Sequence, residues 1–298
     1  MVGTTLAVTP VCLVTGATSG IGRVTAEAMA RAGHRLLMAC RDPIRADAAR
    51  SEIIERTGNR DVHVLTCDLG SLASVRHCAA QTLALTDRLD VLINNAGMMT
   101  TRFHTSADGV ELTLAVNHLG PWLLTRLLLD HLLAAGSARI VNVASAVHQS
   151  GRLDTSRLDG ETAQGFSGMR AYARSKLANV MTTLSLAEQL AGTGMTANCL
   201  HPGVVATNIT GDTNALLRIG MKLISPFVLR PEQGAQTTLY LALDPDIAGV
   251  SGAYFDEHRK RQTPSAAALD RQARDALWAW SSRRCGLSEG IGRVNAAP

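Results

Sequence analysis

The sequence has 298 residues, of which 46% are hydrophobic and 18% charged, a composition that can bury an ordinary globular core. Disorder and collagen-like architecture are thereby excluded. The 29 Lys and Arg against 25 Asp and Glu leave a net charge of +4 spread along the chain, and only 3% of residues are aromatic. Because neither a basic tract nor a base-stacking platform is present, no nucleic acid partner is expected.

The cysteines and histidines point away from disulfide and metal chemistry. None of the six cysteines forms a C-x-x-C pair, and several lie in apolar runs such as Val11–Val14, which is typical of buried thiols in a reducing compartment. The histidines show no H-E-x-x-H spacing, so no metal is expected. We find neither a secretory signal nor a transmembrane anchor, and we expect a cytoplasmic protein.

Apolar, β-branched runs recur through the chain and are nearly continuous, which indicates strands buried on both faces. They are Val11–Thr15, Arg35–Cys40, His63–Cys67, Asp90–Asn94, Arg139–Val143, Met195–Leu200 and Ser251–Phe255. Stretches with helical spacing lie between them: Ile21 to Ala28 with Gly33 as a stop, Ile44 to Arg56, Leu72 to Leu85, Val110 to Leu133, Met169 to Leu190, and Gln233 to Leu243. This alternation predicts an α/β fold with a doubly wound, mainly seven-stranded parallel sheet, forming one domain over residues 1–298.

Three segments depart from this alternation. Gln149–Gly168 is polar and Gly-rich, which predicts a loop. Residues 204–230 are apolar and cationic and follow a strand end, so we expect a substrate-binding lid, with an extra core helix as the alternative. A membrane-surface helix over 214–229, giving weak peripheral membrane contact, is a further reading. Residues 257–298 form a C-terminal extension, in which Trp278 and Trp280 are expected to pack.

A Gly-rich turn follows the first strand and opens the first helix, with the glycines spaced G-x-x-x-G-x-G over Gly16–Gly22. At this place glycine permits a tight turn, lets backbone N–H groups approach a pyrophosphate, and allows close helix–strand packing. The turn therefore predicts a dinucleotide cofactor.

The end of the second strand favours NADP(H) over NAD(H). An acidic residue there would bind the ribose 2′-hydroxyl, whereas a nearby Arg accommodates a 2′-phosphate. Cys40 takes the acidic position and Arg41 follows it. In the alternative, Arg41 is a surface cation and Asp42 binds the ribose. Asp68 and Leu69 close the third strand, where they are expected at the adenine; Asp68 is equally suited to cap the next helix.

Further motifs follow the later strands: Asn94-Asn95-Ala96-Gly97, then Ser145, then Tyr172 and Lys176 in Tyr-x-x-x-Lys spacing. With the Gly-rich turn they make the chain resemble the short-chain dehydrogenase/reductase family over nearly its whole length. Val116–Gly120, Ser175–Val180, His201–Val205, and Ser225–Phe227 followed by Gly234–Thr238 resemble its retinol dehydrogenase and WW-domain oxidoreductase branch. The resemblance implies a Rossmann fold and the transfer of a hydride. We expect no N-terminal anchor like that of the membrane-bound vertebrate members, which weakens the transfer of their retinoid substrate and allows a quite different carbonyl compound.

Tyr172 and Lys176 are four residues apart on one helix face. A nearby ammonium and an oxidised nicotinamide would lower the pKa of the phenol by about two to three units, roughly 3–4 kcal/mol. We therefore expect Tyr172 to act as general acid and base. Ser145 would orient the substrate oxygen, unless it is only a turn residue. Asn117 resembles the family's helix-kink asparagine, whose backbone holds a water linked to Lys176; local hydrogen bonding is its alternative.

The resemblance also implies the cofactor contacts. Pro202, Gly203 and Val205 would line the nicotinamide pocket, and Thr207 would meet the carboxamide or a phosphate, whereas His201 is expected to be structural. The full set of expected cofactor residues is Gly16, Thr18, Ser19, Gly20, Ile21, Gly22, Arg41, Asp68, Leu69, Asn95, Ala96, Gly97, Tyr172, Lys176, Pro202, Gly203, Val205 and Thr207.

These features predict an NADP(H)-dependent oxidoreductase acting on a fairly apolar ketone, aldehyde or secondary alcohol. The alternatives are an enzyme of the same fold that performs an epimerisation or elimination without net redox change, and a non-catalytic NADP-binding regulatory protein. A serine hydrolase is disfavoured because no G-x-S-x-G elbow occurs. The resemblance further implies a homo-oligomer.

Overall fold

One eight-stranded sheet organises the molecule. The computed structural model describes residues 9–159, 162–205 and 229–290, and the strands lie in the order β3-β2-β1-β4-β5-β6-β7-β8. The first seven are parallel, and β8 pairs antiparallel with β7. Their bounds are β1 (Val11–Thr15), β2 (Arg35–Cys40), β3 (Val62–Thr66), β4 (Val91–Asn94), β5 (Arg139–Val143), β6 (Thr196–Leu200), β7 (Tyr254–Phe255) and β8 (Arg261–Gln262). The predicted seven-stranded parallel sheet is confirmed, and the short β8 is an addition at its edge.

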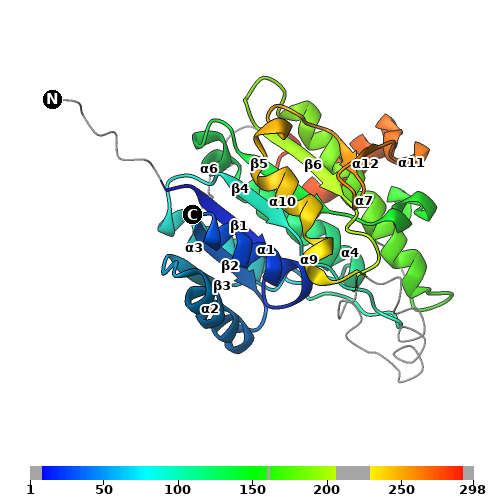
Figure 1. Ribbon diagram of the computed structural model, residues 1–298. Helices are drawn as coiled ribbons and strands as arrows, with labels where there is room; N and C mark the ends of the chain where they lie inside the picture. The colour runs from blue at the N-terminus through cyan, green and yellow to red at the C-terminus, as the bar shows by residue number, and fades with distance from the viewer. Residues whose placement is uncertain (1–8, 160–161, 206–228, 291–298) are drawn as a thin grey trace.

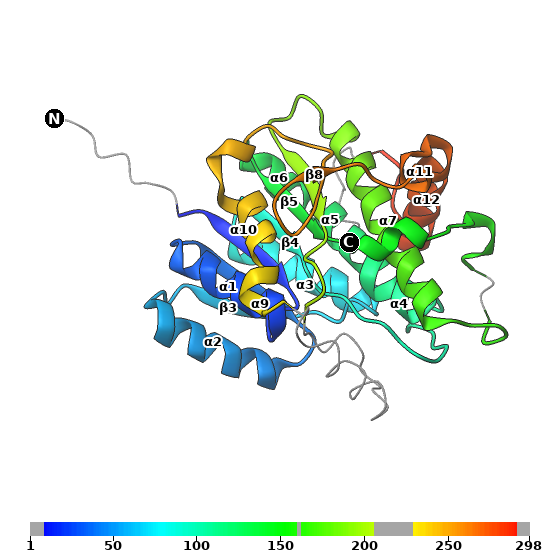
Figure 2. The ribbon, with the colours of Figure 1, turned by 45° about the vertical axis from the view of Figure 1, so that its right-hand side comes forward.

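Helices cover both faces of the sheet (Figures 1 and 2). On one face lie α1 (Gly20–Arg31), α2 (Pro43–Thr57), α9 (Pro231–Gly234) and α10 (Gln236–Leu243). On the other lie α3 (Leu72–Leu85), α5 (Gly120–Leu127), α7 (Gly168–Gln189) and α12 (Arg271–Cys285). Successive strand residues serve opposite faces: Leu13 packs in the core beneath α3, α5 and α7, whereas Val14 packs beneath α1, α2 and α10. Both are fully buried, as a parallel sheet covered on both sides requires.

The helix predicted over Val110–Leu133 is wrong as one continuous element. It is divided into α4 (Leu112–Leu114), a π-helical turn (Ala115–Leu119), α5, and α6 (Leu129–Ala134). The π-helical turn is only five residues long and its residues are mostly buried, so the apolar pattern does not distinguish it from the α-helix on either side. The segment Gln233–Leu243 is likewise divided at Ala235 between α9 and α10.

The predicted loop 149–168 contains only short 3₁₀ turns, Ala146–Ser150 and Thr155–Arg157, among its described residues. It ends where Ser167 caps α7. The segment 206–228 and the residues 291–298 lie outside the described residues. The predicted lid over 204–230, the membrane-surface helix over 214–229 and Thr207 therefore fall wholly or largely outside them.

The C-terminal extension is part of the fold. After β8 come α11 (Ala266–Leu269) and α12, which pack against α7. The Trp122 and Trp278 rings meet edge to face with centroids 5.3 Å apart, and Trp280 is 2% exposed, so the predicted packing role of the C-terminal tryptophans is confirmed. Arg126 packs against both of the first two rings, with its guanidinium carbon 5.1 Å and 5.4 Å from their centroids. Arg126 Nη2 also donates to the backbone oxygens of Ser288 (3.0 Å) and Gly290 (2.6 Å).

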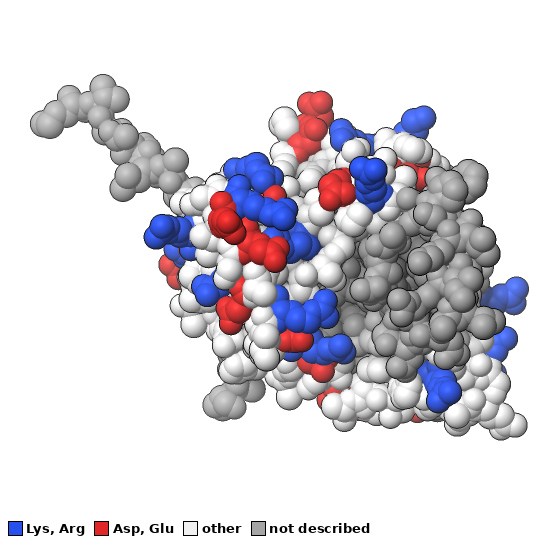
Figure 3. Space-filling model, turned by 60° about the horizontal axis from the view of Figure 1, so that its bottom comes forward, with Lys and Arg blue, Asp and Glu red and all other residues white. Residues whose placement is uncertain are grey.

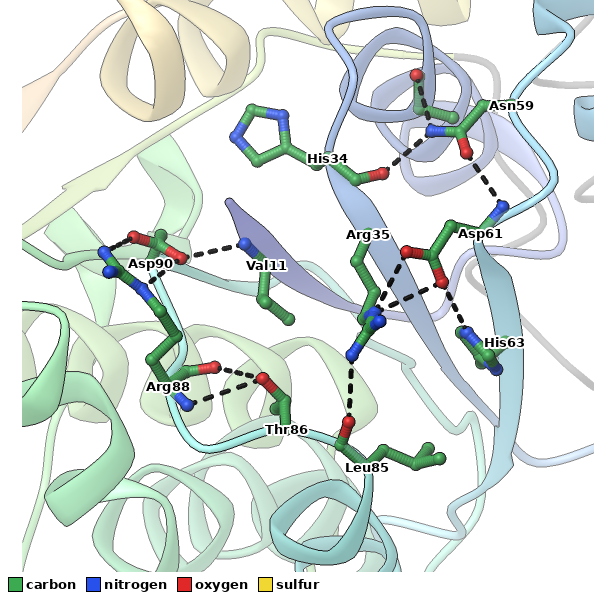
Figure 4. A network of polar contacts seen from close by, with 11 residues as sticks. Val11, His34, Arg35, Asn59, Asp61, His63, Leu85, Thr86, Arg88 and Asp90 are labelled. Atoms are coloured by element: carbon green, nitrogen blue, oxygen red, sulfur yellow. Dashed lines mark hydrogen bonds and ion pairs between the residues drawn. The ribbon is translucent and has the colours of Figure 1, made fainter. Parts of the chain in front are cut away.

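Polar contacts fasten the strands at the amino-terminal edge of the sheet (Figure 4). Asp90 accepts a hydrogen bond from the amide of Val11 (2.8 Å), where β1 begins, and pairs with Arg88. Farther along this edge Arg35 donates to Asp61 (3.0 Å), which also contacts His63 (2.7 Å). The polar groups at this end of the sheet are occupied by contacts with one another. A ligand site is therefore expected at the opposite end, in the loops that follow the carboxyl ends of the strands.

The described surface carries both signs of charge. On the face shown in Figure 3, Lys and Arg side chains alternate with Asp and Glu. On α1, Glu27 pairs with Arg23 and Arg31, and with Arg56 of α2. Among the helices described here, none has the length and apolar character to cross a membrane.

Candidate active site

The Gly-rich turn leaves the amino end of α1 open. Gly16 and Gly20 have positive φ angles of 68° and 56°, which favour glycine. Ser19 precedes the helix but makes no side-chain capping hydrogen bond. A Cβ atom on Gly22 would lie 2.3 Å from the backbone oxygen of Gly16, so only glycine fits there. Uncapped amides at a helix start suit a phosphate, and these residues therefore fit the dinucleotide they were predicted to bind. Thr18 and Ile21 lie in the same turn, with Ile21 buried.

Hydrogen bonds join this turn to the end of β4. The Thr15 hydroxyl accepts the amides of both Asn95 and Ala96 at 3.0 Å, and Asn95 Nδ2 donates to the backbone oxygen of Thr15 at 3.0 Å. Asn95 and Ala96 were expected to touch the cofactor, whereas here their polar groups hold two strand ends together. Thr15 was not singled out in the sequence, because a threonine at a strand end has no distinctive spacing.

The residues that were predicted to bind the adenosine part of the cofactor lie just after the ends of β2 and β3. Arg41 is exposed and makes no ion pair or hydrogen bond within the described part of the chain. The carboxylate of Asp42 accepts the amides of Ile44 (3.0 Å) and Arg45 (3.1 Å) and so caps α2. Asp68 accepts the amide of Gly70 at 2.9 Å.

The observed helix caps bear on the two alternative roles considered above, Asp68 as a helix cap and Asp42 as the ribose contact. Ser71, not Asp68, is the residue that caps α3, so the capping alternative for Asp68 is wrong. Leu69, which follows Asp68, is buried. Asp42 is engaged by the start of α2, which is a different use from the ribose contact that was its alternative.

Tyr172, Ser145 and Lys176 come together at the carboxyl end of β5. Ser145 lies just beyond that strand, after Ala144, and its side chain hydrogen-bonds with Tyr172 of α7. One turn along α7, the ammonium of Lys176 lies 5.6 Å from the centroid of the Tyr172 ring. Lys176 Nζ donates to the backbone oxygen of Val143 at 2.8 Å, and the side chain is 3% exposed. The predicted one-face arrangement of Tyr172 and Lys176 is present.

Burial dominates the titration of this pair. It raises the pKa of Tyr172 to about 12, although the hydrogen bond with Ser145 opposes the rise. Burial also lowers the pKa of Lys176 to about 8. The predicted lowering of the phenol pKa is therefore not a property of the chain alone, because desolvation of the phenolate outweighs the hydrogen bond with Ser145.

Asn117 lies in the π-helical turn and reaches across to other elements. Its Oδ1 accepts the amide of Met98 (2.8 Å), while Nδ2 donates to the backbone oxygen of Met98 (2.9 Å) and to Ser175 Oγ (2.9 Å). The alternative of purely local hydrogen bonding is thus wrong. Gly97 lies in the same corner, where a Cβ atom would be 3.2 Å from Lys176 Nζ. The predicted kink is present, and the water relay stays a prediction. Met98 lies in no motif, and Ser175 was named only within Ser175–Val180, with no role beside Asn117.

The segment after β6 returns to the Gly-rich turn. Gly203 has a φ of 77°, and His201, just after β6, pairs with Glu257 at 3.1 Å. Val205 packs on Ile21 of α1 and is joined to Leu229 by a parallel β-bridge. Pro202, Gly203 and Val205 therefore lead from the sheet edge to the start of α1, which is where the predicted nicotinamide pocket requires them. The His201 ion pair agrees with the structural role expected for that residue.

A cavity of about 720 Å³ opens beside the start of α7 and is lined by Ser150, Arg152, Arg157, Phe166, Arg170 and Arg174, among others. Neither Ser145 nor Tyr172 lines it. Its cationic lining differs from the apolar pocket predicted for the substrate, and we assign the chemistry to the Tyr172 corner, where the polar groups converge.

Comparison with known proteins agrees with this geometry. The family model described as short chain dehydrogenase matches residues 10–217. The chain belongs to the short-chain dehydrogenase/reductase family. Human retinol dehydrogenase 13 is 41% identical over 92% of this chain and 84% of its own length. Human dehydrogenase/reductase SDR family member 13 is 44% identical over 93% of this chain and 74% of its own length. These similarities place this family member in the retinol dehydrogenase-like branch.

Solved structures show the same fold. An uncharacterized protein from Mycobacterium paratuberculosis superimposes with a TM-score of 0.74 at 32% identity and covers 95% of both chains. A structure from Beutenbergia cavernae, described as an NAD(P)-dependent gluconate 5-dehydrogenase with bound NADP, gives a TM-score of 0.65 at 32% identity, covering 83% of this chain and 94% of its own. This short-chain dehydrogenase is thus a Rossmann-like α/β oxidoreductase of a family that uses nicotinamide cofactors.

Proposed function

We propose that the protein transfers a hydride between NADP(H) and a fairly apolar ketone, aldehyde or secondary alcohol, with Tyr172 as the general acid and base. The observation that carries this proposal is the convergence of Ser145, Tyr172 and buried Lys176 at the carboxyl edge of the sheet. That edge also holds the open start of α1. Open α/β sheets bind ligands at this edge, where their strand order reverses.

The chain's own groups supply the proton in the reduction. The bound dihydronicotinamide would deliver the hydride to the carbonyl carbon. Tyr172 would give its hydroxyl proton to the carbonyl oxygen, and the Ser145 hydroxyl would donate a hydrogen bond to the same oxygen as negative charge develops on it. The product is an alcohol, and the proton lost by Tyr172 is replaced from solvent. Asn117 and Lys176 are the residues we propose for that resupply.

The raised pKa of Tyr172 supports reduction as the favoured direction. With a pKa of about 12, the phenol keeps its proton at neutral pH and is ready to donate it. The reverse reaction needs the phenolate, which burial disfavours. An oxidised nicotinamide would bring a positive charge close to Tyr172, and we propose that this charge provides the lowering of the pKa that the chain alone does not.

The decisive variant for this proposal is Tyr172→Phe, which removes one hydroxyl and keeps the ring. With NADPH and a panel of hydrophobic ketones and aldehydes, we expect kcat to fall about 10²- to 10⁴-fold, the usual worth of a positioned acid. The Kd of NADPH should stay within about twofold. Tyr240, which packs against Phe255 away from Ser145, offers a matched control: Tyr240→Phe should keep wild-type turnover.

The same assay separates the alternatives. A non-catalytic regulatory protein would bind NADPH and consume none of it, in wild type as in Tyr172→Phe. An epimerase or a lyase would form product with no net change in the absorbance of the reduced cofactor. Turnover with NADPH that is equal in wild type and Tyr172→Phe contradicts the role given to the phenol.

We infer the preference for NADP(H) from the charges at the end of β2. Arg41 is exposed and free for a 2′-phosphate, while Asp42 is engaged in capping α2. Arg41→Ala should raise the Kd of NADPH about ten- to a hundredfold, since a charge-assisted hydrogen bond contributes about 1.5–3 kcal/mol. The Kd of NADH should hardly change. Equal losses for both cofactors would contradict the assignment of Arg41.

The substrate class rests on sequence and on relatives. Leu216, Leu217, Ile219, Met221 and Leu223 lie outside the described residues, and their apolar composition suits a cover over a hydrophobic substrate. Several relatives bear the name retinol dehydrogenase, and a hydrophobic alcohol or carbonyl compound is the class that we propose here. Weak contact with a membrane surface, a cytoplasmic location and self-association stay predictions.

A further inference from the structure

His148 lies in the 3₁₀ turn that follows Ser145 and is wholly buried. Its Nδ1 is 2.8 Å from the backbone oxygen of Ser145, and its Nε2 is 3.3 Å from the backbone nitrogen of Ser265. A carbonyl oxygen can only accept and an amide N–H can only donate. The two partners therefore assign the imidazole as neutral, with its proton on Nδ1 and a lone pair on Nε2.

The surroundings of this imidazole keep it in place. The ring of Tyr254 meets the imidazole edge to face with centroids 4.7 Å apart, and the ring of His201 also lies against Tyr254, with centroids 5.9 Å apart. His201 in turn pairs with Glu257. Burial lowers the pKa of His148; the hydrogen bond with the Ser145 backbone opposes this, and the nearby His201 adds a smaller lowering. The ring is thus a fixed, uncharged hydrogen-bonding group.

Through the hydrogen bond from Nδ1, the imidazole fixes the position of the Ser145 carbonyl group. The same carbonyl oxygen also accepts the amide of His148 (3.1 Å), so one residue holds it twice. The turn then packs tightly on α7: a Cβ atom on Gly151 would lie 2.6 Å from the backbone oxygen of Ala173, the residue next to Tyr172. A shift of His148 would therefore move Ser145 relative to Tyr172.

Through Nε2 the imidazole reaches the C-terminal extension. Ser265 is the residue that caps α11, and its hydroxyl accepts the amide of Ala268 at 3.3 Å. Because α11 packs on α7, the extension is anchored both to the catalytic helix and, through His148, to the turn that bears Ser145.

We propose that His148 is a positioning residue: it holds the backbone of Ser145 so that the serine hydroxyl faces Tyr172, and it ties that turn to the C-terminal extension at Ser265. This inference rests on the proposed function, in which Ser145 orients the substrate oxygen. It adds a residue that touches neither the substrate nor the cofactor and acts only through Ser145.

Three substitutions separate the two arms of the imidazole. Asparagine places an amide N–H near the position of Nδ1, so His148→Asn can keep the bond to Ser145. Glutamine places an oxygen near the position of Nε2, so His148→Gln can keep only the bond to Ser265. Phenylalanine fills the same space and keeps neither. We expect His148→Gln and His148→Phe to lose about ten- to a hundredfold in kcat, the scale of a misplaced catalytic group. We expect His148→Asn, which loses only the bond to Ser265, to be about three- to tenfold slower than wild type, as Ser265→Pro is.

Binding of NADPH, measured by fluorescence titration, should stay within about twofold in all three variants, because no imidazole contact reaches the Gly-rich turn. Wild-type kcat in a folded His148→Phe variant would overturn the proposal, and so would an asparagine variant as slow as the phenylalanine one. Should the phenylalanine variant not fold, the comparison of asparagine with glutamine decides between the same outcomes.

Ser265 tests the second arm. Its φ of −60° admits proline. Ser265→Ala removes only the capping hydroxyl, whereas Ser265→Pro also removes the N–H that His148 accepts. We expect Ser265→Pro to be about three- to tenfold lower in kcat than Ser265→Ala, and equal values would overturn the link to the extension.

Independently of turnover, ¹⁵N NMR of the wild-type imidazole should show a neutral ring protonated on Nδ1 at pH 7. A ring protonated on Nε2 would overturn the assignment, whereas wild type without any turnover would overturn the proposed function alone.

Discussion

Lys176 shows how a single residue of the site can lower the stability of the fold. Its ammonium is buried and has one backbone acceptor, the oxygen of Val143. The pKa lowered to about 8 means that the folded protein holds the lysine proton less firmly than the unfolded chain does. At pH 7 the charge is present in both states, and its burial opposes folding.

Lys176→Met should therefore stabilise the cofactor-free protein while it abolishes turnover. We expect the free energy of unfolding at pH 7 to rise by about 1–2 kcal/mol, less than the full shift of the pKa implies, because the oxygen of Val143 loses its donor. Denaturant unfolding of both proteins measures this. The gap should narrow as the pH rises from about 8 toward the unfolded value of 10.5, because the folded wild type loses its proton in that range. A methionine variant less stable than wild type at pH 7 would contradict this account.

Residue identity alone could predict part of the site. Tyr172 and Lys176 share a helix face because of their spacing, and the Gly-rich turn has glycines where no other side chain fits. His148 and Ser265 are 117 residues apart in sequence, and nothing in their spacing indicates that they meet. The pKa of Tyr172 was also out of reach, since it depends on how much solvent the fold removes from the phenol.

At the scale of elements, strands were predictable where burial on both faces gives a continuous apolar run. The bounds of β1, β2 and β5 agree with the predicted ones. The predicted strand over Ser251–Phe255 is shorter, because only Tyr254 and Phe255 pair with β6. The family resemblance implied a kink at Asn117, but the residue pattern alone does not predict the π-helical turn there, because Asn117 bonds to Met98 and Ser175 from other elements.

Asp90 tests the role of the amino-terminal edge of the sheet. It accepts the amide of Val11 and pairs with Arg88, so Asp90→Ala leaves a buried amide and a partly buried cation without their acceptor. We expect a loss of about 1–3 kcal/mol in the free energy of unfolding. Asp87→Ala is the matched control, because this exposed neighbouring carboxylate makes no hydrogen bond or ion pair within the described residues. It should leave the free energy of unfolding unchanged. Since the edge faces away from the site, the Kd of NADPH should not change; a large change would show that the two edges are coupled.

At the scale of the whole molecule, a buried cation helps to fix the end of the described C-terminal extension. Arg126 packs against two indole rings and donates to two backbone oxygens near the end of the described chain. This contact joins α5 in the middle of the sequence to residues 288–290.

Arg126→Met should loosen that junction without affecting the chemistry. We expect amide hydrogen exchange at residues 287–290 to become at least about tenfold faster, since two charge-assisted hydrogen bonds are lost. Turnover should remain within about twofold. Arg283→Met, at an exposed arginine of α12, is the control and should leave the exchange unaltered. Unchanged exchange in Arg126→Met would mean that the indole rings alone retain the segment.

The β-bridge between Val205 and Leu229 has a practical meaning for this enzyme class. Val205 and Leu229 are far apart in sequence but pair side by side. We therefore expect that the segment connecting them can be exchanged for another without altering the rest of the fold. If that segment forms the lid that we propose over the substrate, exchanging it among relatives should change substrate choice and leave Ser145, Tyr172 and Lys176 in place.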